Sequence, residues 1–141
     1  MLAIPDVTRF IVIEVAESRH ALRMASRIGE IIPPRDSATS RAVLPYFEPR
    51  QQAIMLGRPP NRVEKADFTL TQEREWALSV DEVMQGATAL AAAVFDPHGQ
   101  PMGALIISGP TERLTCDRHD EVGGLVAKAA RKLSRKSPAG R

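Results

Sequence analysis

Alternating hydrophobic and polar positions along the chain predict a mixed set of strands and helices. The β-branched run Phe10–Val15 predicts a strand. Over residues 21–29 apolar and polar side chains alternate with a period of two, which predicts a second strand that Gly29 ends. The stretches 88–96 and 101–109 are apolar runs joined by a short glycine-containing connection, and they predict a β-hairpin. Because both runs are apolar at nearly every position, we expect both faces of the sheet to be covered there.

A stiff segment, "GEIIPPRDSATSRAVL" at 29–44, leads into the first predicted helix. This helix should begin near Ala38, with Asp36 or Ser37 as its N-cap, and Pro45 should end or bend it. The entrance has two interpretations. It is either ordinary helix capping, or an open helix N-terminus whose unpaired N–H groups bind a negatively charged group.

The middle of the chain is less regular. A short helical turn is predicted over 51–56, followed by a loop at "GRPPN". The stretch 67–78 resembles a helix capped by Asp67, and 78–83 is a loop or the start of a strand.

The stretch 111–136 is predicted to form the terminal helix. Its apolar residues fall on one stripe at the helical period: Val122, Leu125, Val126, Ala129 and Leu133. The predicted order is strand, strand, helix, helix, hairpin, helix. This order is typical of an α+β domain with a mostly antiparallel sheet.

Composition narrows the class of protein. The chain has 141 residues, enough for one domain, with 43% hydrophobic and 26% charged residues and a net charge of +2. This small charge does not by itself indicate nucleic-acid binding. One cysteine, Cys116, excludes an internal disulfide and a cysteine-based zinc cluster. We find no signal peptide and no apolar run long enough for a membrane span, so we expect a cytoplasmic protein.

Candidate catalytic groups are few. No pair among the histidines has metal-ligand spacing (His20, His98 and His119). Cys116 lies close to the N-terminus of a predicted helix but has no base nearby in sequence. The pair Asp81 and Glu82 is typical of a solvated loop or a strand end. We therefore predict no enzyme activity, no metal and no cofactor. The basic residues near the C-terminus have the spacing of a solvated helix face: Lys128, Arg131, Lys132 and Arg135.

The second half of the chain resembles the effector-binding domain of IclR-type bacterial transcription regulators. The resemblance is carried by "DEVMQGATALAAAVFDPHGQPMGALIISGPTERLT" at 81–115, with an Ala-rich strand that ends at Phe95 and a characteristic "SGP" at 108–110. The first half agrees, because "MASRIGEIIPPRDSATSRAVL" at 24–44 is similar to the family stretch in which a strand, a proline and a small-residue turn open a helix.

The resemblance implies a GAF-like fold, a mostly antiparallel β-sheet flanked by helices around a cupped pocket for a small organic acid. We expect residues 1–136 to form this domain and 137–141 a flexible tail. It also implies self-association as a dimer or tetramer. DNA binding would occur only through a winged helix-turn-helix domain that this sequence lacks, and no membrane is involved.

Eight pocket residues follow from the resemblance: Met24, Ile32, Ala38, Thr39, Ser79, Ala89, Ile106 and Ser108. The backbone N–H groups at Ala38 and Thr39 would hold the ligand's carboxylate. Relatives that bind small 2-oxo acids commonly have an acidic residue at the position of Ser79, a cysteine at Ala89 and a serine at Ile106. The loss of these polar groups favours a larger or more apolar carboxylate ligand.

Two further departures concern the cover of the pocket. The stretch between Leu44 and Glu82 is shorter than in the family, and Glu75 stands where the family commonly has glycine before an aromatic residue, here Trp76. The leading hypothesis is an effector-sensing, oligomerising domain. The alternatives are a dimerisation or interaction module with a degenerate pocket, and a small enzyme that uses Asp81 or Cys116.

Overall fold

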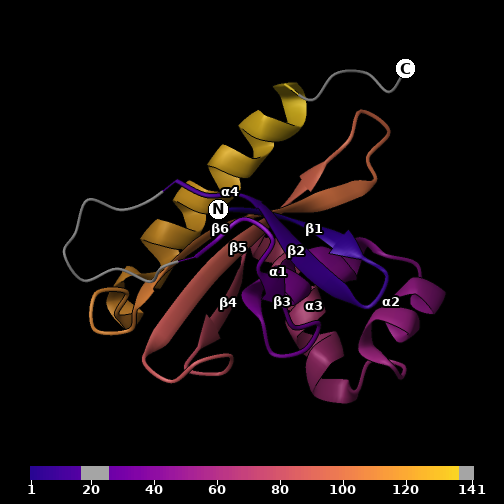
Figure 1. The fold of residues 1–141 in the computed structure, drawn as a ribbon, viewed down its shortest axis with the longest axis horizontal. Coiled ribbons are helices and arrows are strands. Elements are labelled where there is room, and N and C mark those ends of the chain that lie inside the picture. The colour runs from indigo at the N-terminus through magenta and orange to yellow at the C-terminus, as the bar shows by residue number, and fades with distance from the viewer. Residues whose placement is uncertain (17–25, 137–141) are drawn as a thin grey trace.

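The computed structural model describes residues 1–16 and 26–136, which form a six-stranded antiparallel sheet flanked by helices (Figure 1). The strand order is β3-β2-β1-β6-β5-β4. The strands are β1 (Leu2–Asp6), β2 (Arg9–Glu14), β3 (Ile31–Ile32), β4 (Ala77–Val80), β5 (Ala87–Phe95) and β6 (Pro101–Pro110). The helices are α1 (Ala38–Val43), α2 (Pro49–Leu56), α3 (Arg62–Arg74) and α4 (His119–Lys136), with short 3-10 turns η1 (Leu44–Tyr46) and η2 (Cys116–Arg118). The predicted α+β fold class is confirmed.

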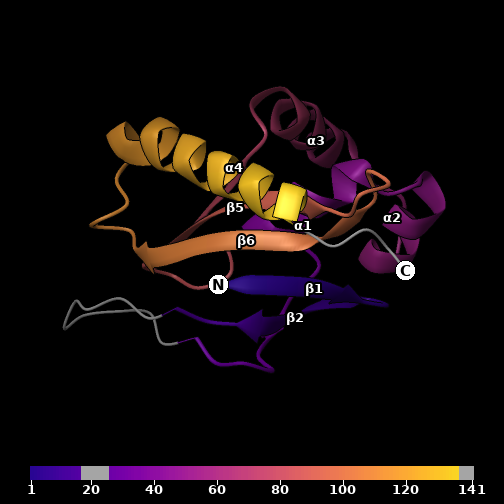
Figure 2. The ribbon, with the colours of Figure 1, turned by 90° about the horizontal axis from the view of Figure 1, so that it is seen from above.

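The predicted hairpin forms the centre of the sheet, and Figure 2 shows α4 on one side of β6 with β1 and β2 on the other. Both α4 and α1 pack against β5. Leu90, Ala92 and Val94 pack with α4 in one hydrophobic cluster. Ala91 packs in a second cluster, with α1, α2 and α3. Coverage is complete for the middle of β5, whereas Ile107 on β6 is 41% exposed.

The N-terminal strands differ in part from the sequence prediction. β2 matches the predicted Phe10–Val15 within one residue. β1 was not predicted, because Pro5 interrupts a stretch that the fold places between β2 and β6. The second predicted strand, 21–29, lies mostly outside the described residues, and its described end, Ser26–Gly29, contains a turn with Gly29 at φ 90°.

Local side-chain chemistry decides where the helices begin. α1 begins at Ala38 as predicted, capped by the Ser37 hydroxyl, which accepts from the Ser40 N–H at 3.1 Å. The prediction that Asp67 caps α3 is wrong. The N-cap lies six residues earlier, at Asn61, because Asn61 and Glu64 form a reciprocal capping box that the hydrophobic pattern does not reveal.

The apolar stripe of α4 is also partly wrong. Leu125 is 57% exposed and Ala129 is exposed, whereas Ala127 and Ala130 are buried with Val122 and Val126. The helix therefore turns the side that carries Val122, Val126, Ala127 and Ala130 toward the sheet. The helix proper is also shorter than 111–136, because residues 111–115 form a turn before η2.

Gly123 allows α4 to approach the indole of Trp76, and this close approach can be tested. A Cβ built at Gly123 would lie 2.3 Å from Trp76 Cδ2, whereas one at Gly124 meets nothing within 4 Å. We expect Gly123→Ala to destabilise the fold by about 1–3 kcal/mol through overpacking. Gly124→Ala should stabilise it by about 0.5–1 kcal/mol, because alanine is the better helix former. Chemical denaturation of both variants measures the difference, and equal effects would contradict the packing described.

Candidate functional site

A cavity of about 140 Å³ lies between the sheet and the start of α1. Its floor is a cross-strand row in which Ser79 of β4 pairs with Ala89 of β5, and Ala89 pairs with Ser108 of β6. Ile106 lies two residues before Ser108 and therefore faces the same side. Small side chains in this row leave space that larger ones would fill.

Seven of the eight residues predicted from the sequence line this cavity: Ile32, Ala38, Thr39, Ser79, Ala89, Ile106 and Ser108. The eighth, Met24, lies outside the described residues. The hairpin register alone would place Ala89 opposite Ser108. The meeting of these strands with α1 depends on the tertiary fold.

Further lining residues were not predicted: Met1, Val12, Ser26, Glu30, Ser37, Val83, Met84, Ala87 and Thr88. Thr88 belongs to the predicted hairpin, so its register could have indicated it, whereas Ala87 lies one residue before the predicted strand. Met1 precedes β1 and Val12 lies in β2, and the sequence pattern does not give the place of these strands in the sheet.

A hydrogen-bonded network fixes the entrance of α1. The Ser37 hydroxyl donates to the Pro33 carbonyl at 2.9 Å while it caps the helix. The Ser79 hydroxyl donates to the Asp36 carbonyl at 2.8 Å and thereby holds Asp36 in a left-handed conformation, with φ 61°. The entrance is thus tied to β4 across the cavity.

Two hydroxyl groups of the cavity remain available. Those of Thr39 and Ser108 have no hydrogen-bond partner within residues 1–16 and 26–136. The main-chain N–H groups of Ala38 and Thr39 lie in the first turn of α1, where a helix offers no internal acceptor. Hydroxyl and amide donors therefore converge on one space.

No Lys or Arg lines the cavity among the described residues, and Glu30 is its one charged lining residue in that part of the chain. The Glu30 carboxylate accepts from the Arg27 main-chain N–H at 3.1 Å. An acidic ligand would therefore be held by neutral donors, which are weaker than charged ones.

The loop 81–86 contributes Val83 and Met84 to the cavity, and both side chains are more than half exposed, at 52% and 57%. Its ends are held by Asp81, whose carboxylate accepts from the Gly86 N–H and the Thr111 hydroxyl, both at 2.8 Å. Asp81 thus has the loop-stabilising role that the sequence favoured over catalysis.

Arg41 of α1 joins the helix to this loop. Its guanidinium donates to the Glu82 carboxylate and to the Leu78 carbonyl, each at 2.8 Å, and lies 3.5 Å from the Asp67 carboxylate. The hydrogen bond that Arg41 donates to the Glu82 carboxylate raises the pKa of Arg41 above its usual range, so the guanidinium stays charged. The ion pair fastens the loop beside the helix entrance.

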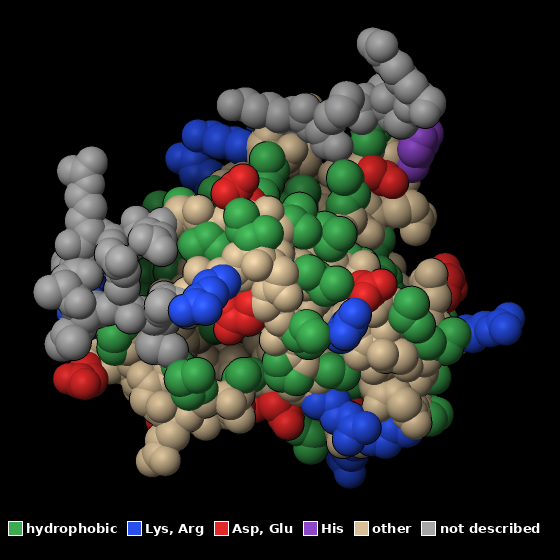
Figure 3. Space-filling model, in the orientation of Figure 1, with side chains coloured by type: hydrophobic (Ala, Val, Ile, Leu, Met, Phe, Trp, Pro, Cys, Tyr) green, Lys and Arg blue, Asp and Glu red, His purple; other side chains and the backbone are tan. Residues whose placement is uncertain are grey.

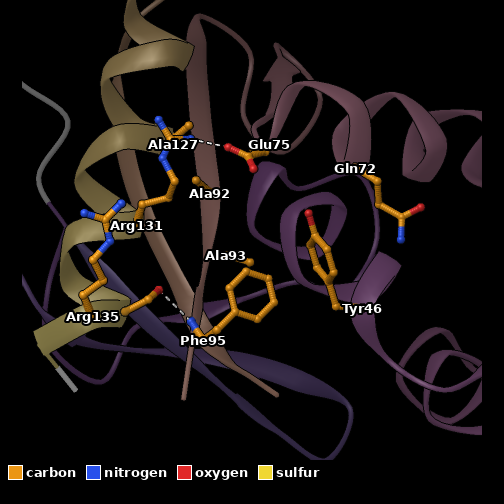
Figure 4. Close-up of a pocket in the computed structure, with 10 residues that line it drawn as sticks. Tyr46, Gln72, Glu75, Ala92, Ala93, Phe95, Ala127, Arg131 and Arg135 are labelled. Atoms are coloured by element: carbon orange, nitrogen blue, oxygen red, sulfur yellow. Dashed lines mark hydrogen bonds and ion pairs between the residues drawn. The ribbon is translucent and has the colours of Figure 1, made fainter. Parts of the chain in front are cut away.

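A second hollow, of about 400 Å³, lies on the other side of β5 between α3, η1 and α4 (Figure 4). It is lined by Tyr46, Gln72, Glu75, Ala92, Ala93, Phe95, Ala127, Arg131, Ser134 and Arg135. None of these residues belongs to the predicted pocket.

Metal and thiol chemistry find little support. The described residues contain no cluster of three or more potential metal ligands. Cys116 is exposed. His98 is exposed, whereas His119 is half-buried with Nε2 at 2.9 Å from the Leu114 carbonyl, and His20 lies outside the described residues. None of the helices, over their described residues, has the length and apolar character of a membrane span.

The Arg41 ion pair allows a direct test of how the loop is held. We expect Arg41→Gln to lower the free energy of unfolding by about 1–3 kcal/mol, because Glu82 and the Leu78 carbonyl lose a charged donor. Arg9→Gln is the matched control: it breaks the exposed Arg9–Asp6 pair and should cost about 0.5 kcal/mol or less. Urea denaturation gives both values, and an equal loss would show that Arg41 is only a surface residue.

Comparison with known proteins shows to which family the chain belongs. Residues 1–135 match the family described as "Bacterial transcriptional regulator IclR C-terminal". The chain is 31% identical over 135 residues to the transcriptional repressor IclR of Escherichia coli K12, covering 88% of this chain and 49% of that protein. The chain thus spans about half the length of this relative.

Solved structures of other proteins have the same fold as this chain. The Thermotoga maritima IclR structure superposes with a TM-score of 0.85 at 21% identity, covering 96% of this chain and 59% of that one. The inducer-binding domain of PobR from Acinetobacter was solved as a double mutant with 3-hydroxybenzoic acid. It superposes with a TM-score of 0.78 at 17% identity, and the match covers 94% of this chain and 85% of that one. The relatives are transcriptional repressors and not enzymes. The chain belongs to the IclR family of bacterial transcriptional regulators and corresponds to their C-terminal domain.

Proposed function

We propose that this domain senses a small organic acid for a cytoplasmic transcription regulator. The observation that carries the proposal is the convergence of seven predicted residues, from five different elements, on one cavity. Free hydroxyls at Thr39 and Ser108 and the first-turn N–H groups of α1 point to an oxygen-rich acceptor, such as a carboxylate.

The lining residues suggest how the ligand is oriented in the cavity. The acid end would lie at Ala38 and Thr39, where the helix begins. Its carbon skeleton would contact Val12, Ile32 and Ile106, of which Val12 and Ile106 are buried. The PobR domain, which shares the fold, was solved with an aromatic hydroxy acid, and this supports an organic acid as the ligand class here.

The cavity volume bears on ligand size. At about 140 Å³ it is smaller than the roughly 300–1,000 Å³ of ordinary ligand pockets. In the sequence, the apolar residues Ala89 and Ile106 indicated a larger or more apolar ligand. The volume of the cavity instead favours a compact acid with an apolar side. Residues 1–136 would form the sensing domain, and DNA would be bound only by a winged-helix domain outside this chain.

The free hydroxyls give the sharpest test of the sensing function. A thermal-shift screen of compact carboxylic acids should show concentration-dependent stabilisation of the wild-type chain. We expect Thr39→Val and Ser108→Ala each to weaken the best acid by about tenfold, because each removes one donor while leaving the apolar shape nearly unchanged. Titration calorimetry measures the change in Kd.

Ser79→Ala serves as the comparison variant. It should lower the melting temperature even without ligand, because the Asp36 carbonyl loses its hydrogen bond. The Thr39 and Ser108 variants should melt like the wild type. Unchanged affinity in both of these variants would refute the proposed site, and the absence of any stabilising acid would favour the module with a degenerate pocket.

Self-association is the second candidate role, and one face of the sheet favours it. α4 packs on β5 and β6, while Ile4, Ile11 and Ile31 form a cross-strand row on the same face over β1, β2 and β3. Ile4 and Ile31 are 39% and 54% exposed. Hydrophobic side chains also gather over the middle of the face on which β1 and β2 lie (Figure 3). We propose that a second copy of the chain covers this row, forming a dimer or tetramer.

A charge placed in this row should disrupt the assembly. We expect Ile31→Lys to convert a dimer or tetramer into smaller species, because a lysine ammonium cannot be buried without a partner. Ile54→Lys on α2 is the matched control, since Ile54 is equally apolar and 49% exposed but lies outside the row. Light scattering after size exclusion gives the mass of each. A monomeric wild type, or equal disruption by both variants, would contradict this interface.

A further inference from the structure

We propose that the hollow between α3 and α4 is a second ligand site, separate from the cavity at α1, and that it takes a planar aromatic compound bearing one anionic group. The hollow holds about 400 Å³, which lies within the size range of small-molecule sites. Its residues come from η1, α3, β5 and α4, and Figure 4 shows them arranged around a common space.

The hollow exists because β5 extends beyond its neighbour. β4 pairs only with Thr88–Ala91, so Ala92–Phe95 has no strand on that side. The Phe95 N–H instead donates to the Ser134 hydroxyl of α4 at 2.9 Å. Ala92, Ala93 and Ala127 supply the smallest apolar side chains at this place, so the space beside the strand stays open.

One wall of the hollow is aromatic. Tyr46 and Phe95 meet edge to face, with ring centroids 4.8 Å apart and planes at 89°. The Tyr46 hydroxyl has no hydrogen-bond partner within the described part of the chain. Burial, followed by the nearby Glu75 carboxylate, raises the pKa of Tyr46, so this hydroxyl remains a neutral donor. A flat ligand can therefore stack against aromatic and alanine surfaces beside one available donor.

The opposite wall is basic. Arg131 and Arg135 lie one turn apart on α4, and both line the hollow. Arg131 donates through Nη1 to the Glu75 carboxylate. The other N–H groups of the guanidinium take no part in that hydrogen bond. Arg135 has no ion-pair or hydrogen-bond partner among the described residues. The lining therefore carries one more positive than negative charge, and this excess favours an anion.

Glu75 supports the same conclusion. It adopts φ 69° at the end of α3, in the left-handed region that residues other than glycine rarely occupy. Its ion pair with Arg131 is about half exposed on both sides, and such pairs stabilise a fold very little. Folding alone thus gives a weak reason for glutamate at this strained position. Holding the Arg131 guanidinium in place among the lining residues gives a stronger one (Figure 4).

The test uses 2-naphthoate as the probe and the neutral 2-naphthamide as its isostere. In ¹⁵N-labelled chain, 2-naphthoate should saturably shift the amide resonances of Ala93 and Phe95, and the amide should bind at least tenfold more weakly. Arg135→Gln should weaken 2-naphthoate about tenfold, and Arg135→Lys should keep most of the affinity because the charge remains. Lys132→Gln, the same charge change at an exposed position of α4 outside the hollow, should leave the affinity unchanged.

Three results would overturn the proposal: no saturable shift at Ala93 and Phe95, equal binding of the acid and the amide, or equal losses in the Arg135→Gln and Lys132→Gln variants. The Thr39→Val and Ser108→Ala variants should bind 2-naphthoate like the wild type. If they lose it instead, the acid occupies the cavity at α1 and the second site is refuted, while the sensing function stands. The proposal of this second site can therefore be refuted without refuting the proposed effector pocket at α1.

Discussion

The packing of α1 and α4 on opposite faces of β5 is the interaction on which the rest of this domain depends. Leu90, Ala92 and Val94 face α4, and Ala91 faces the cluster that contains α1. Alanine is unusual in strands because it offers little side chain to pack. Here its small size allows two helices to approach the same strand, with Gly123 giving α4 a still closer approach to Trp76. Each face gains hydrophobic contact at short range.

Both hollows arise where this packing stops. On one face, α1 begins beside the row of Ser79, Ala89 and Ser108, and the small side chains leave the cavity of about 140 Å³. At the other end of β5, the strand extends beyond β4 toward Tyr46 and α4, and the larger hollow opens. The same small residues that allow close packing in the centre thus leave unfilled space at the margins.

The two hollows differ in the kind of donor they offer. The cavity at α1 offers hydroxyl and main-chain N–H groups, and Glu30 is its charged member among the described residues. The hollow at α4 offers two guanidinium groups and one carboxylate. Neutral donors select a ligand by its shape and hydrogen-bond geometry, whereas charged donors select first by ligand charge. An acid could therefore be recognised in two physically distinct ways within one domain.

The sequence alone determined much of the architecture, because local patterns specify local structure. The apolar runs on either side of "PHGQ" gave the hairpin, and Ser37 gave the start of α1. Resemblance to a family then named pocket residues, seven of which share one cavity.

Prediction from the sequence failed where contacts with a residue distant in the chain decide how an element is placed. Leu125 has the spacing of a core residue but is exposed, because α4 turns Gly123 toward Trp76, and Val122 and Val126 toward the sheet. The place of β1, the loop held by Arg41 and Glu82, and the hollow beyond β4 were likewise decided by the tertiary structure. These features depend on contacts between elements, and such contacts leave no periodic pattern in the chain.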